Sequence, residues 1–585
     1  MPARHAAPAL GVFALVVGLG LDEGGYAPTA WGWSAVVALI ALVVVIWRGA
    51  RRPSRPAQVL IAGLAGFAVW AGASTLWSSH VSASVLETQR VLLYVAVAAL
   101  FSLAPRVPLL AGSLAATTCL CGIGLSRWLL GDPEVPLSAD PEAALRLSEP
   151  LGYANGVGAL AAMGLVLSAG VAARAPRAWA AAAAATVPLQ AATLYFTFSR
   201  GAWAALGIGL VAAVAIGPAR LQFAAVAAVL APFAAVAVLA ADSIGRRAAL
   251  AGAIVGVCVL AAGVLIAVGR ARIVVGPRAR TAFAAALVAV PIIAVAGVLV
   301  RLGGPAGALE SFEAAPAPVH GDVAGRVLSV SGSSRADYWS AAWDTYRERP
   351  AIGEGAGTFA RAWLAERDVR QPVRDAHSLY LETLAETGPV GLAVLLLALL
   401  APFAGRRSAW TPAAVGPYTA FLVHAAQDWD WELPAVTVTA LACAVAATAP
   451  PTGPRIPRLV AILPVVLCAV AVFAYAGNRT LGEATAAADR ADARLSADRS
   501  RAATRLQPWS GEPWRSLGEA QLTLGDTEAA RRSFRRGLDR DDGDWELWLD
   551  LGLASDGGAQ RAAWSRAASL NPLSPELKEL GFRRR

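Results

Sequence analysis

Long apolar runs, separated by short polar segments, fill the chain from its N-terminus to about Gly477. Each run holds about 17–25 residues, the length that a helix needs to cross roughly 30 Å of hydrocarbon. The pattern therefore predicts an all-α, polytopic membrane protein with about fifteen spans. The expected span centres lie near residues 15, 39, 67, 98, 119, 162, 187, 209, 231, 259, 290, 392, 418, 441 and 467.

Two long polar regions divide the chain into four parts. Spans are expected over residues 1–300, a large loop over 301–376, further spans over 377–477, and a polar helical tail over 478–585. Arginines gather in alternate connections between the spans, and such connections stay in the cytoplasm. The loop and the tail then fall on the extracytoplasmic side, with Arg246-Arg247 as an exception to the rule.

The composition agrees with a membrane protein, since 56% of the residues are hydrophobic and only 16% are charged. The net charge of +9 comes from arginines between apolar runs, where they orient spans, so no nucleic-acid partner is expected. The five cysteines all lie inside apolar runs, where they are expected to be small buried hydrophobes. No disulfide framework or thiolate metal site is indicated.

The tail contains an internal repeat. Trp514-Arg515-Ser516-Leu517-Gly518 recurs 34 residues later as Trp548-Leu549-Asp550-Leu551-Gly552. This period resembles the tetratricopeptide repeat, a helix-turn-helix unit, and predicts a short α-solenoid. Residues 482–506 are expected to add one more helix or helix pair. A stack of this size suits binding of a protein partner, or packing, better than catalysis.

The second half of the large loop predicts a helix. Residues 334–337 have capping-box spacing, Trp339, Trp343 and Tyr346 follow on one face, and Pro350 ends the helix. The glycines of residues 353–357 predict a flexible turn.

Three arginines are candidates for binding an anion. Arg335 falls in the first turn of this helix, where backbone amides also attract anions. Arg200 has apolar residues on both sides at the end of a span, which favours a functional role, although contact with lipid phosphate would explain it too. Arg90 follows Glu87 by one turn and could simply pair with that carboxylate.

His377 lies where the loop re-enters the membrane. Asp375 is expected to cap a helix that starts at His377, and Glu382 and Glu386 would then fall on the opposite face. Imidazole suits general-base work, while a structural role is the alternative.

A second polar cluster is formed by His424 and Asp428, one helical turn apart. Asp428 and Asp430 form an Asp-x-Asp pair that could hold a divalent cation. Because such short matches are frequent by chance, no metal is expected here.

These residues, in this order, resemble the bacterial O-antigen ligase and polymerase family of polytopic membrane glycosyltransferases. The resemblance rests on residues 151–155, 199–202, 350–355, 377–382 and 386–391, on Arg335 with Trp339, and on His424 with Asp428.

The resemblance implies a GT-C-like fold in the bacterial cytoplasmic membrane and a glycan donor carried on undecaprenyl diphosphate. The acceptor would be a hydroxyl group of a glycan, lipid or protein, and no cofactor is implied. Arg200 and Arg335 would clamp the diphosphate, and His377 would be the base. Supporting roles fall to Arg90, Asn155, Asp375, His424 and Asp428.

Two further activities stay open at this level. A polymerase would join lipid-linked repeat units instead of transferring the glycan to a different molecule. A transporter or scaffold is the alternative from another class, although a transporter would place its polar groups nearer mid-membrane. An extra pair of spans between residues 231 and 290 and the repeat tail depart from the family pattern.

Overall fold

The structure is a computed structural model that describes residues 3–130, 146–216, 220–244, 247–268, 334–369 and 371–582, with Gly332 and parts of 276–314. Its described residues form helices and no strand ladder. The prediction of an all-α polytopic membrane protein is therefore confirmed.

Among the described residues, ten helices precede the large loop and three lie within it. The first ten are α1 (Ala3–Leu21), α2 (Pro28–Trp47), α3 (Arg55–Ser74), α4 (Val81–Ser102), α5 (Arg106–Leu130), α6 (Ala154–Ala172), α7 (Arg177–Phe196), α8 (Arg200–Ile216), α9 (Arg220–Ser243) and α10 (Arg247–Val268) among the described residues. The loop region contains α12 (Gly304–Glu313), α13 (Arg335–Glu348) and α14 (Phe359–Glu366).

The second half continues with four helices that return to the apolar body and six that form the tail. The former are α15 (Leu379–Leu400), α16 (Thr411–Ala425), α17 (Pro434–Ala447) and α18 (Ile462–Asp489). The latter are α19 (Ala493–Leu506), α20 (Glu512–Thr523), α21 (Thr527–Leu538), α22 (Trp545–Leu553), α23 (Gly557–Leu570) and α24 (Pro575–Glu579).

Every expected span centre except the one near residue 290 falls inside one of these helices. The centre near 290 lies outside the described residues. Eight described helices are long and apolar enough to cross a membrane, namely α2 to α6, α9, α15 and α18, and α1, α8, α10 and α17 are shorter apolar helices. The total of about fifteen spans stays a prediction.

Two helices, α6 and α17, form the centre of the apolar body, because each is buried along its whole length. Small residues let their neighbours approach closely, as in other membrane helix bundles. A side chain at Gly170 would meet Ala413 of α16 at 2.5 Å, and one at Gly209 would meet the carbonyl oxygen of Gly416 at 2.8 Å. These contacts fix α6, α8 and α16 against one another.

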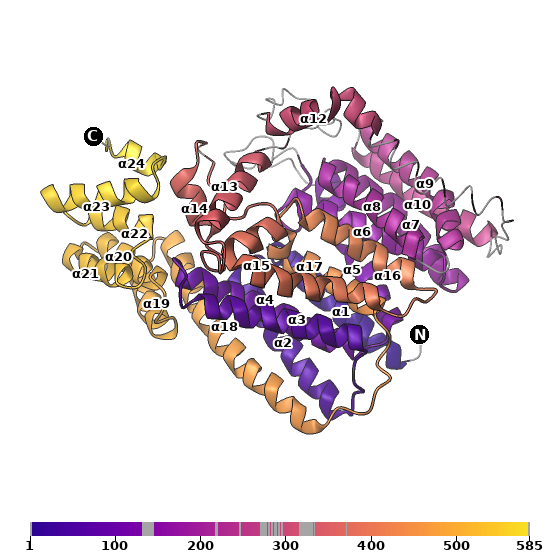
Figure 1. The fold of residues 1–585 in the computed structure, drawn as a ribbon, viewed down its shortest axis with the longest axis horizontal. Helices are drawn as coiled ribbons and strands as arrows, with labels where there is room; N and C mark the ends of the chain where they lie inside the picture. The colour runs from indigo at the N-terminus through magenta and orange to yellow at the C-terminus, as the bar shows by residue number, and fades with distance from the viewer. Residues whose placement is uncertain are drawn as a thin grey trace.

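The tail packs at one end of the molecule, beside α13 and α14 and near the first turns of α4 and α15 (Figure 1). Helix α18 connects it to the body and continues through the boundary predicted at residue 477 as far as Asp489. Arg361 of α14 pairs with Asp541, and Arg367 donates a hydrogen bond to Asn571 at 2.9 Å. The tail is thus attached to the loop region by polar contacts as well as by the chain.

The repeat predicted in the tail is visible as two similar helix pairs, α20 with α21 and α22 with α23. Gly518 faces Phe534 in the first pair, and Gly552 faces Trp564 in the second. In each pair a glycine Cβ would lie within 2.4 Å of the aromatic ring, so the two glycines have the same packing role. The likeness to the tetratricopeptide repeat itself stays a resemblance.

Candidate functional site

A hydrogen-bonded cluster around Asp428 joins three distant segments. Its Oδ2 accepts hydrogen bonds from Arg335 Nη2 at 2.9 Å and from Asn155 Nδ2 at 2.7 Å. Its Oδ1 accepts from the Tyr153 hydroxyl at 2.7 Å. Arg146 donates to the Asn155 side-chain oxygen. The loop after α16, the start of α6 and the start of α13 therefore meet at one buried carboxylate.

The charge of Asp428 is maintained by its surroundings. Burial raises the pKa of this carboxyl, but the positive charge of Arg335, helped by the hydrogen bond from Tyr153, outweighs burial and lowers the pKa to about 2. For Arg335, burial lowers the pKa while the Asp428 charge raises it, and the net shift is upward. Both groups are therefore charged at neutral pH, and the guanidinium is held in a fixed orientation.

One edge of the Arg335 guanidinium is hydrogen-bonded within the protein. Nε donates to the backbone carbonyl of Gln427 at 2.6 Å, and Nη2 donates to Asp428. Nη1 makes no hydrogen bond within the described part of the chain. The helix that carries Arg335 is confirmed, but the predicted capping box is wrong. Ser334 adopts a left-handed backbone and its side chain makes no cap hydrogen bond.

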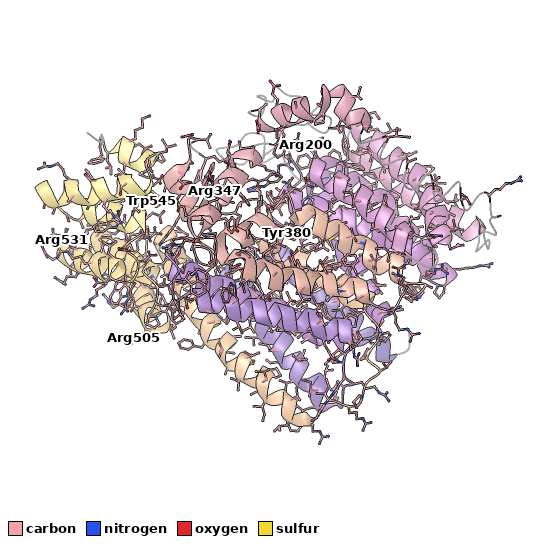
Figure 2. All side chains as sticks on the ribbon, in the orientation of Figure 1. Arg200, Arg347, Tyr380, Arg505, Arg531 and Trp545 are labelled. Atoms are coloured by element: carbon pink, nitrogen blue, oxygen red, sulfur yellow. The ribbon has the colours of Figure 1, made fainter. Side chains whose placement is uncertain are left out.

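Arg200 starts α8, at the junction where α7 ends. It lies within electrostatic reach of Arg335 and Arg146, so three arginines converge near Asp428. Phe198, just before it, has φ of 48°, which turns the chain sharply between the two helices. The placement of Arg200 at a helix junction agrees with the sequence prediction, and Figure 2 labels this residue where α8 approaches the loop region.

His377 does not start a helix, contrary to the prediction. Its φ of 53° is left-handed, α15 begins at Leu379, and Ser378, rather than Asp375, caps that helix by accepting from the Leu381 amide. Its Nδ1 lies 3.0 Å from the Asp375 carbonyl oxygen. Because a carbonyl can only accept, Nδ1 carries the proton and Nε2 presents a lone pair. The ring packs on Tyr338, with 5.1 Å between centroids.

Left-handed backbone gathers around the three main candidates. Among the described residues, the non-glycine positions with positive φ are Glu23, Phe198, Ser334, His377 and Ala491. Three of these five positions are at or near a candidate. His377 is itself a candidate, Ser334 directly precedes Arg335, and Phe198 lies two residues before Arg200. Such conformations cost about 1–3 kcal/mol each and persist where the surrounding structure enforces them, which is frequent at functional sites.

His424 lies in the predicted polar cluster with Asp428 and Asp430, and the sequence assigned it no single partner. Its Nδ1 pairs with Asp430, and not with Asp428, one helical turn away. Asp428 and Asp430 are thus engaged by separate groups, Asp428 by Asn155, Tyr153 and Arg335 and Asp430 by His424.

A cavity of about 1150 Å³ lies on the other side of Trp429, between the apolar body and the tail. We call it the chamber. Its walls come mainly from the start of α4, residues 354–387, residues 429–432 and the tail, with further residues from 26–31, α3 and α13. Trp429 packs on Tyr153 at 4.2 Å between ring centroids and on Tyr26 at 5.5 Å. This indole therefore separates the chamber from the Asp428 cluster.

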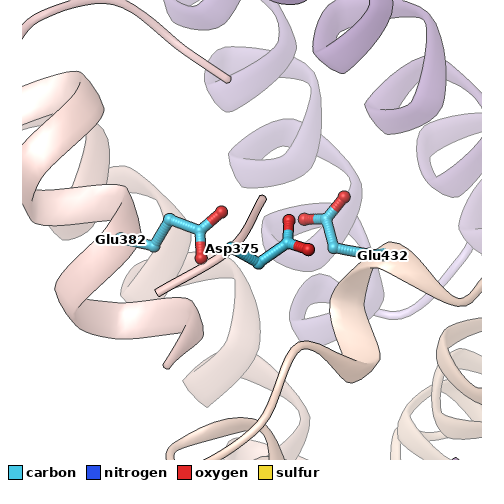
Figure 3. A group of neighbouring side chains, drawn as sticks. All are labelled: Asp375, Glu382 and Glu432. Atoms are coloured by element: carbon cyan, nitrogen blue, oxygen red, sulfur yellow. The ribbon is translucent and has the colours of Figure 1, made fainter. Parts of the chain in front are cut away.

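The chamber is strongly acidic. Fourteen acidic residues line it against five arginines, including Arg90, which pairs with both Glu87 and Glu432. The expected pairing of Arg90 with Glu87 is confirmed. Asp375, Glu382 and Glu432 have carboxylate oxygens within 4.8 Å of one another (Figure 3). Burial raises the pKa of Asp375. A raised pKa favours the neutral form of Asp375, so the repulsion of an anionic ligand group comes from the other carboxylates that line the chamber.

The glycines of residues 353–357 form a packed turn, which corrects the prediction of a flexible one. The Glu386 carboxylate accepts hydrogen bonds from the Gly357 amide at 2.7 Å and the Phe359 amide at 3.0 Å, ahead of the first turn of α14. Gly353 has φ of 70°, and a Cβ there would lie 2.3 Å from the Glu386 carbonyl oxygen. This turn therefore holds α14 against α15.

Several residues of the site had no individual role in the sequence prediction. Tyr153, Arg146, Trp429, Glu432 and Glu386 gain their roles only from contacts across the fold. The one available signal was the alternation of acidic and aromatic residues over 428–432, which places Trp429 and Glu432 beside Asp428.

The fold and this site together define a polytopic helical membrane protein with a buried arginine–carboxylate cluster next to an acidic chamber. Residues 244–396 match the family model described as O-Antigen ligase. The matched segment, which holds both Arg335 and His377, is similar to the O-antigen ligase family, as the sequence motifs indicated. This match supports a ligase- or polymerase-like membrane glycosyltransferase. No curated protein matches the chain.

Proposed function

We propose that the chain transfers a glycan from an undecaprenyl-diphosphate carrier to an acceptor hydroxyl at the extracytoplasmic surface of the bacterial cytoplasmic membrane. The observation that supports this proposal is the convergence of Arg200, Arg335 and His377 near Asp428. These three side chains come from the start of α8, the start of α13 and the segment before α15.

The arginines would bind the diphosphate. When the bond from the anomeric carbon to the phosphate oxygen breaks, negative charge develops on the leaving diphosphate. Guanidinium groups that are already oriented stabilise this charge without reorganising. Gln427 and Asp428 provide that orientation for Arg335, and Nη1 remains as a donor.

His377 would act as the general base. The acceptor oxygen attacks the anomeric carbon, and its hydroxyl proton passes to Nε2 while the glycan–phosphate bond breaks. The hydrogen bond from Nδ1 to the Asp375 carbonyl supports this role, because it leaves Nε2 as the proton acceptor.

The chamber would admit the acceptor. Its excess of carboxylates disfavours a diphosphate and tolerates an uncharged sugar hydroxyl. Asp375 and Leu379 both line the chamber, and His377 lies between them in the sequence. The chamber therefore reaches the segment that carries the proposed base. On this proposal, donor and acceptor approach from opposite sides of Trp429.

The experiment is reconstitution of the purified chain with a lipid-diphosphate oligosaccharide. Wild type is expected to release lipid diphosphate only when an acceptor is present. His377→Ala is expected to lose about 10²- to 10⁴-fold in rate, the range for one general base, with donor binding retained. A variant that turns over normally would show that His377 is not the base.

The arginine roles have a matched control on the same helix. Arg335→Gln and Arg200→Gln are expected to weaken donor binding, whereas Arg347→Gln removes an exposed guanidinium of α13 and should leave it unchanged (Figure 2). Unchanged donor affinity in both site variants would contradict the clamp. Elongation of the lipid-linked glycan itself, in place of transfer to another molecule, would identify a polymerase.

A further inference from the structure

A second hollow lies on the tail, away from the chamber. It has a volume of about 490 Å³ and is formed by α19, α20 and α21. We call it the arginine groove. Four arginines and no carboxylate line it, and the other lining residues are uncharged. The lining residues are Arg501, Thr504, Arg505, Trp514, Leu517, Gln521, Ala529, Arg532, Ser533 and Arg536.

Most of this positive charge is not neutralised within the described part of the chain. Arg501 pairs with Asp498 at 2.7 Å, but Arg505, Arg532 and Arg536 make no ion pair there. The guanidinium of Arg536 lies over the Trp514 ring, 5.1 Å from its centroid, which holds this cation at the edge of the groove. Three unpaired guanidinium groups, one from α19 and two from α21, attract negative charge to the hollow between these helices.

The charge of the groove is local to one side of the tail. The side that faces the chamber carries the acidic residues Glu512, Asp541 and Asp544. The tail as a whole is therefore not simply basic, and the two hollows select ligands of opposite charge. Figure 2 shows Arg505 at the outer edge of the tail, on the opposite side from α14.

The shape of the groove favours an acidic peptide over two other anions. A flat membrane surface would reach only the rim of a concave site. A sugar ring would need the open face of Trp514, which the Arg536 guanidinium covers. Carboxylate side chains on an extended segment can enter and accept paired hydrogen bonds from guanidinium groups, with Thr504 and Gln521 as further partners.

We propose that the arginine groove is a docking site for an acidic segment of a partner protein. This inference does not depend on the proposed glycan transfer, because no groove residue takes part in it.

The test uses the full chain in nanodiscs of zwitterionic lipid, with a fluorescent hexaglutamate peptide as the probe. Saturable binding by fluorescence anisotropy is expected, and it should weaken as salt is added. Arg505→Gln combined with Arg532→Gln should weaken binding at least about tenfold, since each removes charge-assisted hydrogen bonds. The control, Arg535→Gln combined with Arg540→Gln, makes the same charge change at exposed positions outside the groove and should shift binding less than about twofold.

Three outcomes would overturn the proposal. The first is no saturable binding of hexaglutamate, and the second is equal loss in the groove variant and its control. The third is tighter, groove-dependent capture of anionic phosphatidylglycerol vesicles than of the peptide, which would assign the arginines to lipid. An unchanged thermal unfolding midpoint of the groove variant would show that the chain is folded, so a loss of peptide binding could then be assigned to the missing arginines.

Discussion

Arg335 and Asp428 form an ion pair with 2.9 Å between Nη2 and Oδ2, although 93 residues separate them along the chain. One residue begins the helix of the large loop, and the other follows α16 in the apolar body. The pair therefore fixes the loop helix to the body at the point where Asn155 and Tyr153 also bind Asp428.

Removing the Asp428 charge is expected to destabilise the fold. Asp428→Asn leaves the Arg335 guanidinium without its counter-ion in a site where the Asp428 side chain is 1% exposed. Breaking one partner of a buried pair costs about 3–5 kcal/mol. Thermal unfolding in detergent should show a clear drop for Asp428→Asn and little change for Asp337→Asn, which removes an exposed carboxylate from α13, the helix that carries Arg335. Equal drops would contradict the assignment.

The same carboxylate predicts how stability depends on pH. Its pKa in the folded chain is about 2, below its ordinary value of 3.8. A lowered pKa means that the ionised form stabilises the fold, and this stabilisation is present above pH 3.8 and lost as pH falls toward 2. Wild type should therefore lose more thermal stability than Asp428→Asn between about pH 4 and pH 2.5. Parallel curves for the two proteins would contradict this.

A side chain at Gly353 is expected to disrupt the packed turn against α15. Gly353→Ala combines a left-handed backbone, which costs about 1–3 kcal/mol for alanine, with a Cβ 2.3 Å from the Glu386 carbonyl oxygen. Gly525→Ala is the matched control, because φ is 84° there and nothing lies within 4 Å. Thermal unfolding should show the larger loss for Gly353→Ala. A smaller loss of thermal stability for Gly353→Ala than for Gly525→Ala would show that the turn can rearrange to accept a side chain.

The tail contact with α14 can be tested by charge reversal. Arg361→Glu should repel Asp541 and loosen the tail, because the Asp541 side chain is only 8% exposed and loses its guanidinium partner. Hydrogen exchange over residues 541–553 is expected to rise. The swapped pair, Arg361→Glu with Asp541→Arg, should restore protection at least in part. If the single variant leaves exchange unchanged, the contact does not hold the tail.

Glycan transfer is expected to survive exhaustive chelation. The carboxylates of Asp428 and Asp430 bind side chains of the protein, namely Arg335, Asn155, Tyr153 and His424. In the proposed mechanism, arginines therefore stabilise the negative charge of the leaving group. Transfer assays with and without a chelator should give equal rates. Loss of activity that added Mg²⁺ restores would contradict the metal-free proposal.

Much of the fold could be predicted from the sequence because its signals are local. Apolar runs of membrane-spanning length gave helices at the expected centres, and a 34-residue repeat gave two similar helix pairs in the tail. Arg200, Arg335 and His377 could each be picked out, because an ionisable residue beside apolar runs is unusual wherever the rest of the chain lies.

Local patterns failed where the backbone leaves the regular helix. Ser334 and His377 were expected at ordinary helix starts, yet both are left-handed, and the turn over residues 353–357 is packed where flexibility was expected. Contacts from other segments hold these conformations, and such contacts leave no trace in the spacing of neighbouring residues.

The sequence by itself determined which segments are helical and which side chains can carry the chemistry, since helix formation and hydropathy depend on neighbouring residues. Only the tertiary structure decided the partners: Asp428 for Arg335, Asp430 for His424, and Glu432 for Arg90. A buried charge binds whichever opposite charge the packing of helices brings within reach, and that packing joins segments tens to hundreds of residues apart.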